Sequence, residues 1–233
     1  LVMNNLIGLL ESLGVVVVWT WPVGVDWRKN LEKIRSKPQV DAIIVNGEGT
    51  IHHSAERKHA RSLAEFAKFA QEDLGTSCYL INSTLYANTN SLYEYLKSYK
   101  AIYVRDKGSL NELNSFGLEG EYVPDLTFAH NKTFSGNTKY KGCVIDTALK
   151  SEVPRLKRFC KSSGFQFRSM VVARPSNANF FKSPRPFIKN FTKWLFFDRK
   201  TSINHSAFIE YLNKCEIVVS GRYHTVTMCL KNK

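Results

Sequence analysis

The segment Glu216-Ile217-Val218-Val219 runs directly into Ser220-Gly221-Arg222-Tyr223-His224 near the end of the 233-residue chain. The short β-branched run predicts a buried strand, and the Ser-Gly break predicts a helix over 223–230. Backbone N–H groups at a helix N-terminus stabilise anions. Arg222 adds a planar fork for phosphate or carboxylate, and His224 can move a proton near neutral pH. The junction favours acid–base chemistry on an anionic substrate; the structural alternative is a solvated arginine and a histidine satisfied within the fold.

The rest of the chain alternates between strand-like and helix-like segments. Apolar runs predict strands at 15–19, 42–45, 78–81, 101–104, 142–145 and 167–173. Helical spacing and capping residues predict helices at 1–13, 26–36, 55–72, 92–97, 109–116, 153–160 and 206–213. This alternation predicts an α/β fold whose parallel sheets are covered on both faces. We expect two α/β domains, 1–130 and 142–233, with a linker at 131–141 and a long irregular loop at 176–201.

The bulk properties indicate a folded, cytoplasmic protein. Hydrophobic residues make up 43% of the chain and aromatic residues 12%, which is typical of a globular domain. No apolar run approaches the roughly 18 residues of a membrane span, and the start lacks the basic residues of a secretion signal. The five cysteines form no C-x-x-C pair, which fits reduced thiols. We also expect truncation at both ends, because no strand precedes the first helix and one helix follows the Arg-His turn.

Positive charge is concentrated in one part of the chain. The net charge is +13, and the stretch 150–200 holds 13 Lys or Arg residues against only Glu152 and Asp198. Such an excess suits nucleic acid, an anionic membrane surface, or an acidic glycan or phosphorylated substrate. A solvated basic face explains it as well, so the charge alone selects no partner.

Ligands of parallel α/β sheets gather at the carboxyl ends of the strands, so the turns at these ends are considered together. The first turn, Asn46-Gly47-Glu48-Gly49-Thr50, follows the strand predicted at 42–45. Its glycines let the backbone approach a ligand closely, and Glu48 or Thr50 can bond to hydroxyl groups. The lysine-containing phosphate loop and the complete G-x-G-x-x-G are both absent from the sequence, which weighs against nucleoside triphosphate and dinucleotide binding.

Two further turns carry charged residues. Arg105 ends the strand predicted at 101–104, so we expect its side chain to point into a crevice. Asp106 is predicted to cap the following helix or to pair with Arg105 rather than to act as a catalytic base, and Asp125 to cap a turn rather than serve a site. His52 and His53 have no metal-binding partner at helical spacing, so we predict no metal site. Covalent hydrolase chemistry is unsupported, because the sequence has no G-x-S-x-G.

Taken in order, these pieces resemble the polysaccharide pyruvyl transferase family, whose fold is similar to the two-domain glycosyltransferases of the B type. The matching pieces are the turn 46–49, the segment 104–109 with Gly117, the pair Pro124-Asp125, and Arg222-Tyr223-His224. The chain departs from the family where Gly-Gly-Gly is usual, since it has Asn46-Gly47-Glu48-Gly49. The Asn/Gly-Asp turn expected before the first helix is also missing.

The resemblance implies two Rossmann-like domains with parallel sheets facing a crevice. It also implies transfer of a pyruvyl group from phosphoenolpyruvate to a sugar hydroxyl pair of a cell-surface or exopolysaccharide precursor, giving a ketal without a cofactor. By the same resemblance, His224 and Arg105 are the catalytic residues. The residues that bind the donor are Arg105, Arg222, Ser220 and Gly221. The residues that bind the acceptor are Asn46, Gly47, Glu48, Gly49 and Thr50.

The stretch 150–200 would then favour an anionic donor or a phosphorylated, lipid-linked saccharide acceptor at the inner face of the membrane. Two alternatives stay open. A B-type glycosyltransferase using a sugar nucleotide would need an acidic residue for the ribose, and the second domain offers Asp146, Glu152, Asp198, Glu210 and Glu216. A non-enzymatic basic module for anionic glycan or nucleic acid would bind in a salt-dependent way that survives loss of His224. Nucleic acid is the partner we expect least.

Overall fold

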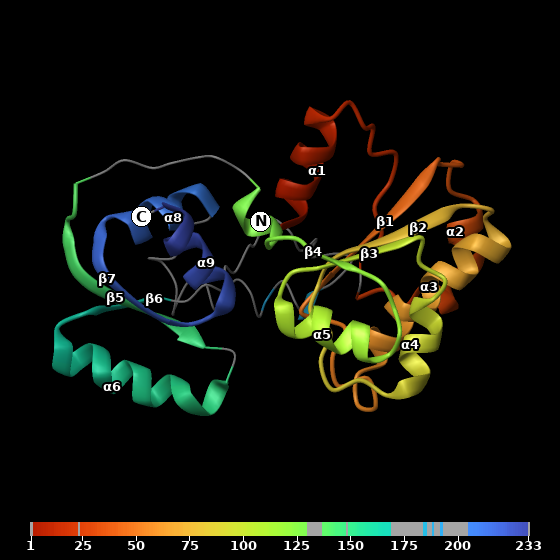
Figure 1. Ribbon diagram of the computed structural model, residues 1–233. Helices are drawn as coiled ribbons and strands as arrows, with labels where there is room; N and C mark the ends of the chain where they lie inside the picture. Colours follow the sequence, from red (N-terminus) through yellow and green to blue (C-terminus); the bar gives the residue numbers. More distant parts are fainter. Residues whose placement is uncertain are drawn as a thin grey trace. The chain divides into compact units, whose positions relative to one another are not determined.

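The computed structural model describes residues 2–22, 24–129, 137–147, 149–168, 184, 185, 188, 192 and 205–232. The chain separates into two compact units, Val2–Ala129 and His130–Lys233, called here the N-terminal and C-terminal units. Each unit contains a parallel sheet with helices on both of its faces (Figure 1). The prediction of an α/β fold with parallel sheets is therefore confirmed.

The N-terminal unit is built on a four-stranded sheet in the order β1 (Ala42–Glu48), β2 (Ser77–Ser83), β3 (Ala101–Val104) and β4 (Glu121–Tyr122). All neighbouring strands pair in parallel, so their carboxyl ends meet at one edge. The helices α3 (Lys58–Asp73), α4 (Asn90–Leu96) and α5 (Lys107–Ser115) lie on one side of the sheet, and α1 (Val2–Ser12) lies on the other (Figure 1). The short helix η2 (Leu126–Phe128) contacts α1.

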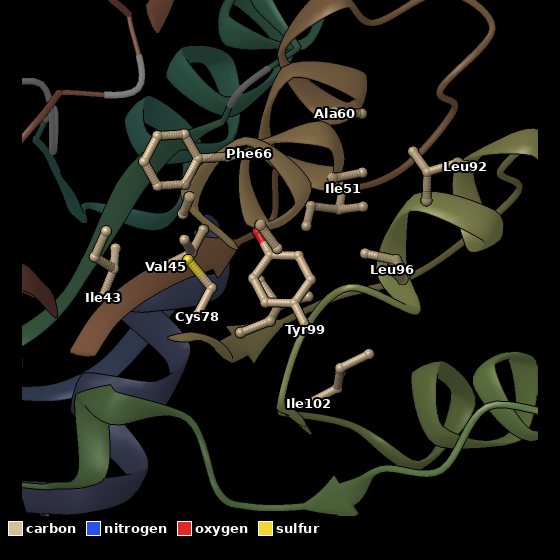
Figure 2. Close-up of a cluster of buried hydrophobic side chains, with 14 of the residues drawn as sticks. Ile43, Val45, Ile51, Ala60, Phe66, Cys78, Leu92, Leu96, Tyr99 and Ile102 are labelled. Atoms are coloured by element: carbon tan, nitrogen blue, oxygen red, sulfur yellow. The ribbon is translucent and has the colours of Figure 1, made fainter. Parts of the chain in front are cut away.

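The core of this unit forms between the sheet and α3. Four alanines of α3 are fully buried, and their small side chains let the helix lie close to the strands: Ala60, Ala64, Ala67 and Ala70. Figure 2 shows Phe66 of this helix in the same cluster as Val45 and Cys78 from the sheet. Burial raises the pKa of the Cys78 thiol to about 12, so the thiol stays protonated and packs as an apolar group. Each large apolar side chain buried here contributes about 1.5–3 kcal/mol.

The C-terminal unit contains a three-stranded parallel sheet in the order β6 (Gln166–Arg168), β5 (Tyr140–Thr147) and β7 (Cys215–Gly221). Helix α6 (Val153–Ser163) covers one face, and α8 (His205–Asn213) and α9 (Tyr223–Asn232) cover the other (Figure 1). Gly164 caps the C-terminus of α6, and its φ of 67° is the left-handed conformation that favours glycine. This topology brings the strand ends of β5 and β7 side by side.

Three local predictions are wrong. Residues 15–19 form no strand, because nothing pairs with them and Val15, Val16 and Val18 are 45%, 80% and 50% exposed. The helix predicted at 26–36 is divided into η1 (Trp27–Lys29), capped by Asp26, and α2 (Leu31–Arg35). Strand β1 does not stop at residue 45 but continues through Glu48, since Asn46 and Glu48 still pair with β2.

Some predictions fall where the structure gives no description. The loop at 176–201 and the last part of the strand at 167–173 lie for the most part outside the described residues. So do most residues of the linker predicted at 131–141, although Tyr140 already begins β5. The domain limits drawn from the sequence stay predictions.

Candidate functional site

Arg105 lies at the carboxyl end of the N-terminal sheet, directly after β3. Its Nη1 contacts Asp125 Oδ2 at 2.9 Å, and its Nε donates to Thr84 Oγ1 at 2.7 Å. The side chains of Arg105 and Asp125 are only 9% and 1% exposed, so the two form a buried ion pair. Such a pair tolerates burial when its polar atoms are hydrogen-bonded, and removal of one partner is costly.

Two aspartates fix the surroundings of Arg105. Asp106 caps α5 by accepting from the Ser109 N–H at 2.8 Å, and it also accepts from Thr84 Oγ1 at 3.2 Å. Asp125 caps η2 by accepting from the Thr127 N–H at 2.7 Å. Both capping predictions are confirmed. Asp125 also holds Arg105, a contact that the sequence does not predict.

The turn predicted to bind the acceptor lies beside Arg105. A Cβ on Gly49 would stand 3.2 Å from Arg105 Nη2, and one on Gly47 would stand 1.8 Å from Ser83 Oγ. Both glycines therefore permit close approach between neighbouring strand ends. The Thr50 N–H donates to the Gly47 carbonyl at 3.0 Å, which closes the turn.

A polar network ties this turn to β2. Asn46 Nδ2 donates to Glu48 Oε1 at 3.1 Å, and Asn82 Nδ2 donates to Asn46 Oδ1 at 3.1 Å. Glu48 and Asn82 have φ angles of 43° and 54°, in the left-handed region that most residues avoid. Such strain costs of order 1–3 kcal/mol per residue and persists where surrounding contacts enforce it, as at binding sites. The two strained residues lie on adjacent strand ends.

In the C-terminal unit, Arg222 follows the last residue of β7. Its Nε lies 3.1 Å from Asp146 Oδ1 and its Nη2 lies 3.2 Å from Asp146 Oδ2, so one carboxylate holds two guanidinium nitrogens. The Arg222 and Asp146 side chains are 27% and 11% exposed. Ser220 Oγ accepts from the Arg222 N–H at 3.0 Å, which fixes the turn backbone.

His224 is the second residue of α9 and is half-buried. Its ring meets the Tyr223 ring edge to face, with 5.5 Å between the centroids. Ser220, Gly221, Arg222 and His224 all lie at the junction of β7 and α9. Arg105 and the turn 46–50 come together in the other unit.

Three residues contact these arginines or the acceptor turn although the sequence did not predict these contacts: Thr84, Asn82 and Asp146. A signal was available for each. Asn82-Ser83-Thr84 is a polar run directly after the apolar segment 78–81, and Asp146 directly follows the apolar segment 142–145. Polar residues at the carboxyl ends of parallel strands are the ones that line a crevice.

The acidic residues considered for ribose binding mostly pair with cations. Asp146, Glu152 and Glu210 contact Arg222, Arg155 and Lys214, and Asp198 lies outside the described residues. Within the described ranges, no three His, Cys, Asp or Glu side chains form a group suited to a metal ion. None of the helices in that part of the chain is long and apolar enough to cross a bilayer.

Parallel sheets with an arginine after a strand end in each unit define an α/β protein compatible with the Rossmann-like class. The chain belongs to the polysaccharide pyruvyl transferase family, whose model matches residues 1–233. The protein is therefore a transferase of polysaccharide biosynthesis, with a saccharide as acceptor. A search of curated proteins gave no match.

Proposed function

We propose that this protein transfers a pyruvyl group from phosphoenolpyruvate to a pair of hydroxyls on a saccharide. The observation that carries the proposal is the junction of β7 and α9, where Arg222 and His224 stand two residues apart. The junction offers a cation for the donor's phosphate or carboxylate and a group that exchanges protons, in a chain of the pyruvyl transferase family. The proposal includes the B-type two-domain arrangement expected from the sequence.

The reaction needs three chemical events. The methylene carbon of phosphoenolpyruvate gains a proton and becomes a methyl group. The two sugar oxygens each bond to the neighbouring carbon, and its bond to the phosphate oxygen breaks. The two hydroxyl protons end on the methyl group and on the released phosphate, so the product is a ketal. No redox step is involved, so the proposal includes no cofactor.

The residues divide between these events. Arg222, with Ser220 and Gly221 shaping its backbone, binds the anionic donor, and Arg105 assists it. His224 moves a proton between a hydroxyl and the donor. Residues 46–50 bind the acceptor through Glu48 and Thr50, next to Arg105.

Charge on the C-terminal unit supports a phosphorylated, lipid-linked saccharide as the acceptor. Helix α6 exposes four cations and an aromatic ring, namely Arg155, Lys157, Arg158, Lys161 and Phe159. Exposed cations next to an apolar group suit an anionic membrane surface. The proposal therefore includes a cytoplasmic location at the inner face of the membrane. Lys182 and Lys189 of the basic stretch lie outside the described residues.

Calorimetric titration with phosphoenolpyruvate, set against a panel of sugar nucleotides, tests the proposal. We expect phosphoenolpyruvate to bind and the sugar nucleotides to give no heat of binding. Release of inorganic phosphate in the presence of an acceptor saccharide would then measure turnover. Binding of a sugar nucleotide instead would overturn the proposal in favour of glycosyl transfer. Salt-sensitive binding of polyanions alone, unaffected by His224→Ala, would overturn it in favour of a binding module.

A further inference from the structure

The way in which Asp146 holds Arg222 leaves a defined part of the guanidinium for a ligand. A guanidinium has two edges that can each grip an oxyanion, one formed by Nε with Nη2 and the other by Nη1 with Nη2. Asp146 occupies the first edge with contacts of 3.1 Å and 3.2 Å. The second edge points away from Asp146, and the Arg222 side chain is 27% exposed. Asp146 therefore leaves the edge formed by Nη1 and Nη2 for an anion.

The backbone on both sides of this pair is fixed by the sheet. Ile145 and Thr147, the neighbours of Asp146 in β5, pair with Ser220 and Gly221 of β7. These are the two residues directly before Arg222. A Cβ on Gly221 would stand 2.7 Å from Thr147 Cβ, so the two strand ends are in close contact. Sites supported by strands hold their side chains more precisely than sites on loops.

We propose that Asp146 is a positioning residue: it orients Arg222 so that the outer guanidinium edge receives the carboxylate or phosphate of the donor. The inference rests on the proposed function and adds a residue to it. Asp146 also carries a negative charge, which by itself opposes an anionic donor. If Asp146 orients Arg222, removal of its charge should weaken donor binding. If Asp146 acts only as a negative charge, its removal should strengthen donor binding, so the two roles can be told apart.

The test is calorimetric titration of phosphoenolpyruvate into the full chain carrying Asp146→Asn, Asp146→Glu or Glu152→Gln. Asp146→Asn keeps the shape but loses the paired grip on Arg222. We expect its affinity for phosphoenolpyruvate to fall about tenfold to a hundredfold, the effect of losing one hydrogen bond between charged groups. Asp146→Glu keeps the charge but moves the carboxylate by one methylene, and we expect a similar fall. Glu152→Gln removes an equal charge from an exposed pair in the same unit and should leave the affinity unchanged.

Measurements of KM, kcat and folding distinguish a role of Asp146 in positioning Arg222 from a role in stabilising the fold. We expect the KM for phosphoenolpyruvate to rise more than kcat falls, while KM for the acceptor stays constant. If Asp146→Asn does not fold, as judged by circular dichroism, Asp146→Glu is compared in wild-type and Arg222→Lys backgrounds. A lysine has no second edge to orient, so the effect of Asp146→Glu should vanish in Arg222→Lys.

Each outcome decides a different question. If the wild-type protein does not bind phosphoenolpyruvate, the proposed function fails and the inference fails with it. If the wild-type protein binds it and the folded Asp146 variants bind equally well or more tightly, the proposed function stands and the positioning role is overturned. An equal effect of Asp146→Glu with and without Arg222→Lys would also overturn it.

Discussion

The two units each pair an arginine at a strand end with an aspartate, but they bury the pair to different degrees. In the N-terminal unit the Arg105 and Asp125 side chains are 9% and 1% exposed, and Arg105 shares its bonds between Asp125 and Thr84. In the C-terminal unit the Arg222 and Asp146 side chains are 27% and 11% exposed, and Asp146 holds Arg222 through two nitrogens.

The same two residue types therefore form a deeply buried pair in one unit and a partly exposed pair in the other, and the two degrees of burial have different physical consequences. A deeply buried pair matters most for stability, because an uncompensated buried charge is expensive. A pair that remains partly exposed and leaves one guanidinium edge outward is better suited to a ligand. We therefore expect the Arg105 pair to support the fold and its neighbouring turn, and Arg222 with His224 to dominate donor chemistry.

The largest effect should come from the C-terminal junction. We expect His224→Ala to lower kcat roughly 10²–10⁴-fold, the range for a positioned acid or base, with little change in the affinity for phosphoenolpyruvate. Arg222→Ala should instead weaken that affinity about 10- to 100-fold, because it loses hydrogen bonds to a charged group. Phosphate release and calorimetry measure the two quantities.

His59→Ala, on the exposed surface of α3, is the matched control for loss of an imidazole. It should leave both quantities unchanged. Turnover close to the wild-type value in His224→Ala would exclude an acid–base role and leave His224 as a structural residue. The contrast between the two units would then have to rest on Arg222 alone.

The next effect should appear in the N-terminal unit as lost stability. Asp125→Asn leaves the Arg105 charge buried without its carboxylate, so the free energy of unfolding should fall by about 3–5 kcal/mol. Three of the four tryptophans lie in this unit, so their fluorescence in a urea titration reports mainly its unfolding. Glu32→Gln breaks an exposed pair with Arg35 and should cost less than about 1 kcal/mol. Equal losses in the two variants would contradict the proposed role of burial.

Much of the fold follows from local sequence, and the site follows only in part. Segments such as 78–81 and 101–104 are short, apolar and bounded by breakers, which indicates buried strands. The run 15–19 is equally short and apolar, yet no neighbouring strand pairs with it, and pairing is not a local property.

The same limit applies to the arginines. Arg222 and His224 are recognisable in the sequence because they lie close together, directly after a predicted strand. The pairing of the two arginines with aspartates is not recognisable, because Asp146 lies 76 positions from Arg222 and Asp125 lies 20 positions from Arg105. The pairing of β5 with β7 brings Asp146 to Arg222, and the turn after β4 brings Asp125 to Arg105. The position after a predicted strand therefore identifies the two arginines in the sequence. The degree to which each arginine is buried can be seen only in the folded structure.

The smallest effect should be a pH dependence confined to the N-terminal unit. His52 follows the acceptor turn, and its Nδ1 lies 2.7 Å from His53 Nδ1. Burial lowers the pKa of His52 below its ordinary value of 6.5, and the nearby Arg57 and His53 lower it further. Below about pH 6.5 the unfolded chain therefore binds more protons than the folded one, so stability falls as the pH drops from 7 towards 5. His52→Gln should flatten this dependence of the urea midpoint, measured by tryptophan fluorescence, whereas His59→Gln should retain it. A slope in His52→Gln equal to that of the wild type would assign the dependence to other groups, and the histidines beside the acceptor turn would then have no part in it.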